Sequence, residues 1–275
     1  MLLNEILKAI ILGIIQGITE WLPVSSTGHL IIVEDLMSFQ LSEAFVEAFM
    51  VIIQLASIMA VILLFFKKLN PFLKGKDLVQ RKEDVKLWIK IFVGTIPAAI
   101  GGYLFEDKIE GVLQRPLPVA AALIVYGIIF IAIENSEIKG DTLKFSDLSY
   151  GKAILIGLFQ MLALIPGTSR SGATIIGAML LGASRTVAAE FSFFLSIPIM
   201  LGAGGYKFLK LGASLNPMEW FVLGVGSLTA FLVSILIISF LMDYIKKRDF
   251  KIFGYYRIIL GIVVIVYFFI IKKSF

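Results

Sequence analysis

The sequence of 275 residues contains no cysteine, a single histidine and few charged residues. The absence of cysteine excludes disulfide bonds and every metal or redox site that depends on thiolates. Only 16% of the residues are charged and 59% are hydrophobic, so the chain lacks the polar residues that a water-soluble surface requires. These shortages predict a protein that crosses a lipid bilayer several times.

The formal net charge of +5 comes from Lys and Arg in the loops between apolar runs. No basic stripe carries interleaved aromatic residues, so nucleic-acid binding is not expected. Residues 1–13 lack the basic start and the small-residue cleavage site of a removed signal peptide. The partner that composition predicts is the lipid bilayer itself.

Apolar runs indicate where the chain crosses the bilayer, because a span needs about 20 apolar residues. The qualifying segments are Ala48–Phe66, Val85–Phe105, Pro116–Ile133, Phe191–Tyr206, Trp220–Met242 and Phe253–Ile271. Two of them contain a basic residue, Lys90 or Arg257, which we expect to snorkel toward water. The chain is predicted to be an all-α polytopic membrane protein with six transmembrane helices in one integral membrane domain, residues 1–275.

Four further apolar pieces are too short to span and form two neighbouring pairs, each interrupted by Pro, Gly and hydroxyl residues. This composition is typical of two half-helices that meet at a loop inside the membrane. We therefore predict two re-entrant helix hairpins, at about residues 3–38 and 151–184.

The two predicted hairpins resemble each other in sequence. A shift of 144 residues gives six identities in 20 positions. The identities pair Gly13 with Gly157, Gln16 with Gln160, Ser25 with Ser169, Gly28 with Gly172, Ile31 with Ile175 and Ile32 with Ile176. Each half, about residues 1–140 and 145–275, then has one hairpin and three spans. An odd number of spans turns the second copy upside down, which predicts an inverted-topology repeat.

Loop charges agree with this topology. If the loop Lys67–Lys86 is cytoplasmic, that side of the membrane collects 15 Lys and Arg residues and the other side collects 7. The positive-inside rule is then satisfied with both termini outside. Inverted repeats with broken helices typically surround a binding site near the middle of the bilayer.

The stretch Pro166–Thr174 places Arg170 between serines, with apolar sequence on both sides. An unpaired guanidinium at bilayer depth costs about 3 kcal/mol on insertion scales, so Arg170 needs an anionic partner or a water-filled cavity. Arg170 and the free N–H groups of a half-helix that begins near Ser171 suit a phosphate. Further donors are Ser169, Ser171 and Thr174. The alternative is a purely structural ion pair with Glu20.

The first hairpin carries groups suited to phosphoryl transfer. Gln16 and Glu20 share one helical face, and His29 lies in the first turn of the next half-helix. The turn between them holds the hydroxyls of Ser25, Ser26 and Thr27. We predict that a Ser hydroxyl or a water attacks phosphorus and that Glu20 or His29 takes the proton. Glu20, with Gln16 alongside, is also a candidate ligand for Mg²⁺ or Ca²⁺.

Some of these groups have a structural alternative. Hydroxyls in membrane helices often bond the backbone of the preceding turn, which leaves the roles of Ser25 and Thr174 open. A histidine near a helix start also serves often as a structural hydrogen-bond partner. Three polar residues in or beside predicted spans either line a cavity or lie at helix interfaces: Glu47, Gln54 and Glu190.

Two motifs resemble those of a known family. Gln-x-x-x-Glu at residues 16–20, continued by Trp-Leu-Pro-Val-Ser-Ser-Thr-Gly-His-Leu, and Pro-Gly-Thr-Ser-Arg-Ser-Gly-Ala-Thr at 166–174 are similar to motifs of the bacterial undecaprenyl-diphosphate phosphatases, the bacitracin-resistance proteins. The resemblance extends over the whole chain in length and span pattern. It implies hydrolysis of undecaprenyl diphosphate to undecaprenyl phosphate on the outer face of the bacterial cytoplasmic membrane. This activity recycles the lipid carrier for cell-wall synthesis and confers bacitracin resistance.

The resemblance also implies which residues act. The catalytic positions are Glu20, Ser26, His29 and Arg170. The supporting, substrate-binding positions are Gln16, Ser25, Thr27, Ser169, Ser171 and Thr174. No organic cofactor is expected, and the oligomeric state, a homodimer included, stays open.

The rival function is transport, since a polyprenyl-phosphate flippase would also need an anion site between inverted repeats. Binding alone needs no base beside a nucleophile, so the group Glu20, Ser26 and His29 favours the hydrolase. Both readings require the two hairpin tips to share one cavity. Tips more than about 10 Å apart would exclude a shared phosphate site.

Overall fold

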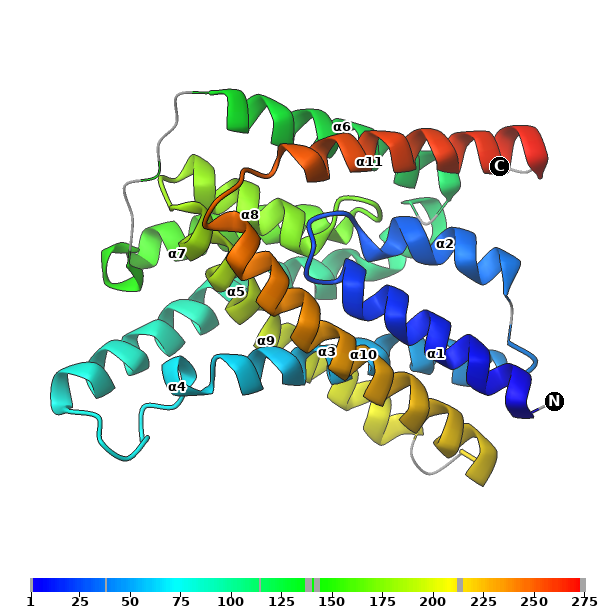
Figure 1. The fold of residues 1–275 in the computed structure, drawn as a ribbon, viewed down its shortest axis with the longest axis horizontal. Helices are drawn as coiled ribbons and strands as arrows, with labels where there is room; N and C mark the ends of the chain where they lie inside the picture. The colour runs from blue at the N-terminus through cyan, green and yellow to red at the C-terminus, as the bar shows by residue number, and fades with distance from the viewer. Residues whose placement is uncertain are drawn as a thin grey trace.

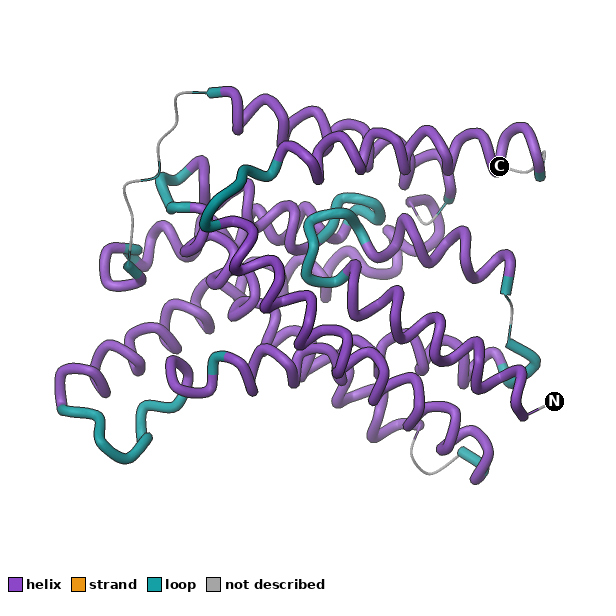
Figure 2. The backbone as a smooth tube through the Cα atoms, in the orientation of Figure 1, coloured by secondary structure: helices purple, strands orange, loops and turns teal. Residues whose placement is uncertain are grey.

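The computed structural model describes residues 2–37, 39–113, 115–136, 140, 144–211 and 215–272. Every regular element in these residues is helical (Figures 1 and 2), which confirms the all-α prediction. The helices are α1 (Leu2–Thr19), α2 (Ser26–Leu36), α3 (Glu43–Leu64), α4 (Phe66–Leu69), α5 (Leu78–Leu113), α6 (Pro116–Asn135), η1 (Phe145–Asp147), α7 (Tyr150–Met161), η2 (Leu162–Leu164), α8 (Arg170–Leu180), α9 (Arg185–Leu211), α10 (Pro217–Ile245), α11 (Lys251–Ile265) and η3 (Val266–Ile271).

Six helical segments are long and apolar enough to cross a membrane. They are Leu2–Thr19, Leu78–Phe105, Pro116–Asn135, Arg185–Lys210, Pro217–Ile245 and Lys251–Ile271. All but the first coincide with predicted spans. The remaining predicted span, Ala48–Phe66, falls in α3, whose apolar part Ala48–Leu64 is shorter than the others. The chain is a multi-pass membrane protein.

Helix α1 begins at Leu2, close to the start of the hairpin predicted at residues 3–38, and is 18 residues long. The two charges that interrupt its apolar sequence neutralise each other, since Lys8 Nζ lies 2.9 Å from Glu5 Oε1 and both side chains are buried. This pairing lets α1 alone meet the length of a span. The helix pair α1–α2 is compatible with a re-entrant hairpin over residues 3–38, which stays a prediction.

Figure 1 shows the helix ends gathered at two opposite ends of the bundle. The starts of α1 and α10 and the end of η3 lie at one end, and the turn between α4 and α5 lies at the other. The pair α1–α2 has its outer ends with the former group, and the pair α7–α8 has its outer ends with the latter. The loops that connect each pair lie between these two ends. This arrangement is compatible with hairpins that enter from opposite sides.

Helix packing follows the same pattern in both halves of the sequence. Helix α1 packs along α10 and α7 packs along α5, while α2 contacts α11 and α8 contacts α6. Helices α3 and α9 pack on each other. Each hairpin therefore contacts helices from the opposite half of the chain, as an inverted repeat would require.

Two glycines permit the closest of these approaches. Gly13 and Gly157 are aligned by the 144-residue shift, and a Cβ at either position would collide with a backbone oxygen, that of Gly226 or of Gly94. Helix pairs in membranes come this close only where small residues lie in the contact. A close backbone contact at a glycine therefore occurs both between α1 and α10 and between α7 and α5.

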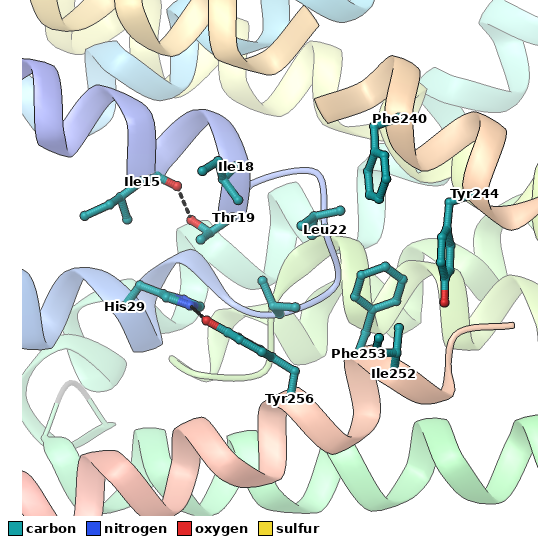
Figure 3. A pocket seen from close by; sticks show the side chains of 11 residues that line it. Ile15, Ile18, Thr19, Leu22, His29, Phe240, Tyr244, Ile252, Phe253 and Tyr256 are labelled. Atoms are coloured by element: carbon teal, nitrogen blue, oxygen red, sulfur yellow. Dashed lines mark hydrogen bonds between the residues drawn. The ribbon is translucent and has the colours of Figure 1, made fainter. Parts of the chain in front are cut away.

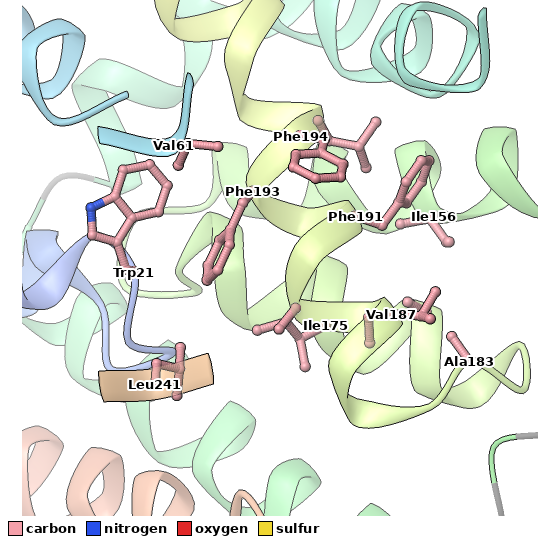
Figure 4. Packing of buried hydrophobic residues seen from close by; sticks show 14 of the residues in the cluster. Trp21, Val61, Ile156, Ile175, Ala183, Val187, Phe191, Phe193, Phe194 and Leu241 are labelled. Atoms are coloured by element: carbon pink, nitrogen blue, oxygen red, sulfur yellow. The ribbon is translucent and has the colours of Figure 1, made fainter. Parts of the chain in front are cut away.

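Aromatic residues fix the end of α1 against α9 (Figure 4). The ring of Trp21 meets that of Phe193 edge to face, with centroids 5.3 Å apart and planes at 89°. Both side chains are fully buried, in a cluster that also contains Val61, Phe194 and Leu241. An edge-to-face pair contributes about 0.5–1.5 kcal/mol beyond the burial of its area.

The two basic residues that were expected to snorkel are buried, so that prediction is wrong. Lys90 is 4% exposed, and its Nζ donates to the carbonyl oxygens of Phe145 at 2.6 Å and Ser146 at 3.5 Å. Arg257 is 0% exposed. In both cases loop carbonyls of the protein take the place of water.

Arg257, on α11, connects the loops of the two hairpins. Its Nη1 donates to the carbonyl of Pro23 at 3.2 Å, and its Nη2 donates to those of Gly167 at 2.8 Å and Thr168 at 2.9 Å. The guanidinium also lies 5.6 Å from the centre of the Tyr126 ring. A buried carbonyl that loses its donor costs about 1–3 kcal/mol, so this one side chain stabilises both loops.

We expect Arg257→Ala to lower the Tm of the protein in detergent by several degrees, because three carbonyl contacts are lost and each kcal/mol shifts Tm by about 2–4 °C. Arg248→Ala is the matched control, since it removes the same charge from an exposed position three residues before α11. Thermal unfolding followed by intrinsic fluorescence compares the two variants. Equal Tm values would contradict this role of Arg257.

Candidate active site

The site lies where the loops of the two hairpins meet. Loop 1, residues 20–25, joins α1 to α2, and loop 2, residues 165–169, joins η2 to α8. Ser171, at the start of α8, donates from Oγ to the carbonyl oxygens of Glu20 at 3.2 Å and Leu22 at 3.4 Å. The two tips are thus in direct contact, well within the limit that a shared site imposes.

An ion pair between Glu20 and Arg170 crosses this junction. Arg170 Nη2 lies 3.0 Å from Glu20 Oε1, and Arg170 Nη1 donates to the carbonyl of Ser192 on α9 at 2.9 Å. The guanidinium also lies 5.6 Å from the centre of the Trp21 ring. The ion pair considered for Arg170 therefore exists. Because the Nε–H of Arg170 has no partner among the described residues, the group retains a donor for a ligand.

The second oxygen of Glu20 faces a hydroxyl. Gln16 Nε2 donates to Glu20 Oε2 at 2.9 Å, and Ser26 Oγ lies 3.5 Å from the same oxygen. Gln16 is fully buried, whereas Ser26 is partly exposed. Arg170 and Gln16 thus orient the carboxylate from two sides, with its second oxygen toward the Ser26 hydroxyl.

Two serines have the same strained backbone, one before each short helix. The φ angles are 73° at Ser25 and 70° at Ser169, in the left-handed region that residues other than glycine rarely adopt. Each Oγ accepts the N–H three residues on, from Gly28 at 3.3 Å and from Gly172 at 3.2 Å. Both serines therefore cap a helix start. Strain of this kind persists where the surrounding structure fixes it, often at functional sites.

The other predicted substrate-binding hydroxyls differ in their surroundings. Thr174 Oγ1 donates to the carbonyl of Arg170 at 2.8 Å and lies 2.6 Å from Ser192 Oγ, which matches the structural alternative. Ser171 contacts loop 1 and lies 3.1 Å from Ser169 Oγ. Thr27 is exposed in the first turn of α2. Ser171 and Thr174 thus hold α8 in place, and Thr27 faces outward.

His29 is held between two partners, of which Figure 3 shows Tyr256. Its Nδ1 lies 2.7 Å from the carbonyl of Ser25, so Nδ1 carries a proton, and its Nε2 lies 2.7 Å from the hydroxyl of Tyr256. The two rings are nearly parallel, with planes at 12°. Both nitrogens are therefore engaged outside the Glu20–Arg170 pair. Sequence reasoning missed Tyr256, because nothing in a predicted span marks which tyrosine approaches a residue more than 200 positions away.

Two cavities adjoin the hairpins. The smaller, of about 390 Å³, is lined by apolar side chains of α1, loop 1, α10 and α11, with Thr19, His29, Tyr244 and Tyr256 as its residues with polar groups (Figure 3). The larger, of about 780 Å³, lies among α3, α5, α7, loop 2 and α9 and reaches Arg170. The smaller cavity therefore borders loop 1, and the larger cavity borders loop 2 and Arg170.

The sequence left open whether three polar residues line a cavity or lie at helix interfaces, and the structure answers this for two of them. Gln54 lines the larger cavity. Glu190 lies at a helix interface, where it forms an ion pair with Lys68 at 2.6 Å. The side chain of Glu47 lies outside the described residues.

The sequence matches the family model described as bacitracin resistance protein BacA over residues 9–263. The chain belongs to this family. Among BacA-family relatives, the undecaprenyl-diphosphatase 1 of Clostridioides difficile (strain 630) is 58% identical over 269 residues, which cover 98% of each chain. The undecaprenyl-diphosphatase of Enterococcus faecalis is 52% identical over 265 residues, 95% of this chain and 96% of the relative. The resemblance inferred from the two motifs is confirmed.

We expect Tyr256→Phe to slow any reaction of this BacA-family chain that uses His29, because the hydrogen bond to Nε2 disappears with little change of shape. One hydrogen bond of about 0.5–1.5 kcal/mol corresponds to roughly a 2- to 10-fold lower kcat. Tyr255→Phe is the control, since this neighbour is also exposed and does not contact His29. The measurement is the rate of phosphate release from undecaprenyl diphosphate, the compound after which the two relatives are named. A further loss in the His29→Ala background would show that Tyr256 acts by another route.

Proposed function

We propose that the protein hydrolyses undecaprenyl diphosphate to undecaprenyl phosphate and inorganic phosphate, and that this recycles the lipid carrier for cell-wall synthesis and confers bacitracin resistance. The observation that carries the proposal is the Glu20–Arg170 pair beside Ser26, between the two hairpin loops. Relatives at 52–58% identity over almost the whole chain are named undecaprenyl-diphosphatases. A transporter would need an anion site but no carboxylate within reach of a hydroxyl.

Charge at the junction favours a diphosphate. Two guanidinium groups, those of Arg170 and Arg257, lie at loops that contribute one carboxylate, Glu20. Helices α2 and α8 both begin at these loops, and the unpaired N–H groups at their N-termini add partial positive charge. An anionic headgroup is thus attracted to the hairpin tips.

The proposed chemistry begins at Ser26. Its Oγ attacks the terminal phosphorus while Glu20 Oε2 takes its proton, and the bond from this phosphorus to the bridging oxygen breaks. Arg170 binds the terminal phosphate and stabilises the charge on its equatorial oxygens. Water then hydrolyses the phosphoserine, which returns Ser26 and releases inorganic phosphate. Direct attack by water, with Glu20 as base, leads to the same products.

His29 is assigned to the leaving group. Its contact with Tyr256 positions Nε2 at the rim of the smaller cavity, whose apolar walls suit the first isoprenoid units of the lipid. In its doubly protonated form His29 donates the Nε2 proton to the bridging oxygen, which lowers the charge of the departing undecaprenyl phosphate, and Nε2 then regains a proton from water. The prenyl chain thus lies in the smaller cavity, and the reacting phosphate lies at the Glu20–Arg170 pair.

We place the site on the outer side of the bacterial cytoplasmic membrane. The Lys-rich turn between α4 and α5 favours the cytoplasm for its end of the bundle, and the hairpin α1–α2 opens toward the other end. All the proposed catalytic groups come from one chain. The site is therefore complete without a homodimer.

A divalent cation fits this scheme only together with the substrate. In the described residues no group of three or more His, Asp or Glu side chains forms a metal site. Glu20 would supply one ligand to Mg²⁺ or Ca²⁺, and phosphate oxygens and water would supply the rest, as is common for Mg²⁺. The bound cation would neutralise charge on the diphosphate.

Glu20→Gln and Arg170→Ala should each lower phosphate release by about 10²-fold or more, because one removes the base and the other removes the clamp. The measurement uses purified protein in detergent with undecaprenyl diphosphate, where no membrane has to be crossed. Glu83→Gln, at an exposed site on α5, is the control for loss of a carboxylate. Near-normal turnover in either site variant, with the Tm preserved, would refute the assignment.

Chelation tests the cation separately. We expect EDTA to lower kcat, and added Mg²⁺ or Ca²⁺ to restore it, because the phosphate charge is then again neutralised. The Tm should change little, since no protein cage depends on the ion. Full activity in excess EDTA would remove the cation from the mechanism.

A further inference from the structure

Gln160, on α7, is a buried polar residue that the mechanism above does not use. It is 2% exposed, and neither its Nε2 nor its Oε1 has a hydrogen-bond partner among the described residues. Buried amides are nearly always paired, because an unpaired donor or acceptor away from water is costly. An amide left without either partner therefore indicates a ligand that is bound part of the time.

Comparison of the two hairpins explains why this amide is free. Gln160 aligns with Gln16, whose Nε2 donates to Glu20 four residues further along the helix. The position four residues after Gln160 is Leu164, which accepts no hydrogen bond from a side chain. The second hairpin thus keeps the amide but lacks the carboxylate.

Gln160 lines the larger cavity, of about 780 Å³, together with Arg170. None of the residues that line this cavity is Asp or Glu. Arg170 likewise retains an unpartnered Nε–H. A cationic group and a free amide, without a competing carboxylate on the wall, form a site suited to an anion.

We propose that this cavity is the subsite for the terminal phosphate of the lipid diphosphate and for the inorganic phosphate it becomes, and that Gln160 is a phosphate-binding residue there. The inference rests on the proposed function and adds a residue to it. Gln160 Nε2 donates to one phosphate oxygen while Arg170 binds another. Binding is its contribution, so it acts on affinity more than on the chemical step.

Gln160→Leu tests the proposal, since it removes both polar groups and keeps a similar volume. We expect the KM for undecaprenyl diphosphate and the inhibition constant of inorganic phosphate to rise together by about tenfold, as for a lost hydrogen bond to a charged group, with kcat changed less than about threefold. Gln160→Glu should raise both constants further, because it places a negative charge beside the phosphate. The Tm of Gln160→Leu should not fall, since an unpaired buried amide is removed.

Ser234→Ala is the matched control. Ser234, on α10, is also fully buried with an unpartnered hydroxyl, but it does not line this cavity. Both constants should stay at their wild-type values in this variant. Unchanged constants in Gln160→Leu, or a fall in kcat alone, would overturn the subsite.

A binding measurement separates this proposal from the proposed function. Inorganic diphosphate should raise the Tm of the wild-type protein and raise that of Gln160→Leu by much less. If that difference appears but the wild type releases no phosphate from the lipid, the subsite stands and the hydrolase proposal fails. If Gln160→Leu hydrolyses the lipid as the wild type does, and inorganic diphosphate raises the Tm of both proteins equally, the subsite is overturned and the proposed function stands.

Discussion

The fold depends on satisfying the backbone of two loops that lie inside an apolar bundle. Loop carbonyls in such a place have no water to bond, so the protein must supply donors. Arg257 supplies them to both loops at once, and Ser171 joins the loops to each other. The positions of the catalytic groups follow from these contacts, since Glu20 and Arg170 emerge directly beside the bonded backbone.

The two hairpins use one backbone design for two tasks. Ser25 and Ser169 have the same strained φ and the same capping bond, so the first residues of α2 and α8 occupy equivalent positions. In the first hairpin that position is Ser26, the proposed nucleophile, and in the second it is Arg170, the proposed phosphate clamp. The two copies of this backbone thus present different side chains at the same position.

Sequence predicted the helical fold, most spans and the meeting of Glu20 with Arg170, because charge spacing and motif chemistry are local properties. It failed for Lys90 and Arg257, since a charge in an apolar run looks the same whether it ends a span or finds a partner inside the protein. The hydrogen bond between Tyr256 and His29 was not predicted either. It depends on which faces of α2 and α11 meet, and one sequence contains no record of that contact.

The packing of α1 along α10 bears on how the protein is made. Helix α1 is synthesised well before α10, the helix on which it mainly packs, so it enters the bilayer before that partner exists. Until then Gly13 and the buried Glu5–Lys8 pair face lipid or an insertion factor. The contact between α1 and α10 can therefore form only after α10 has been made, and a chain truncated before α10 would leave α1 without this packing partner.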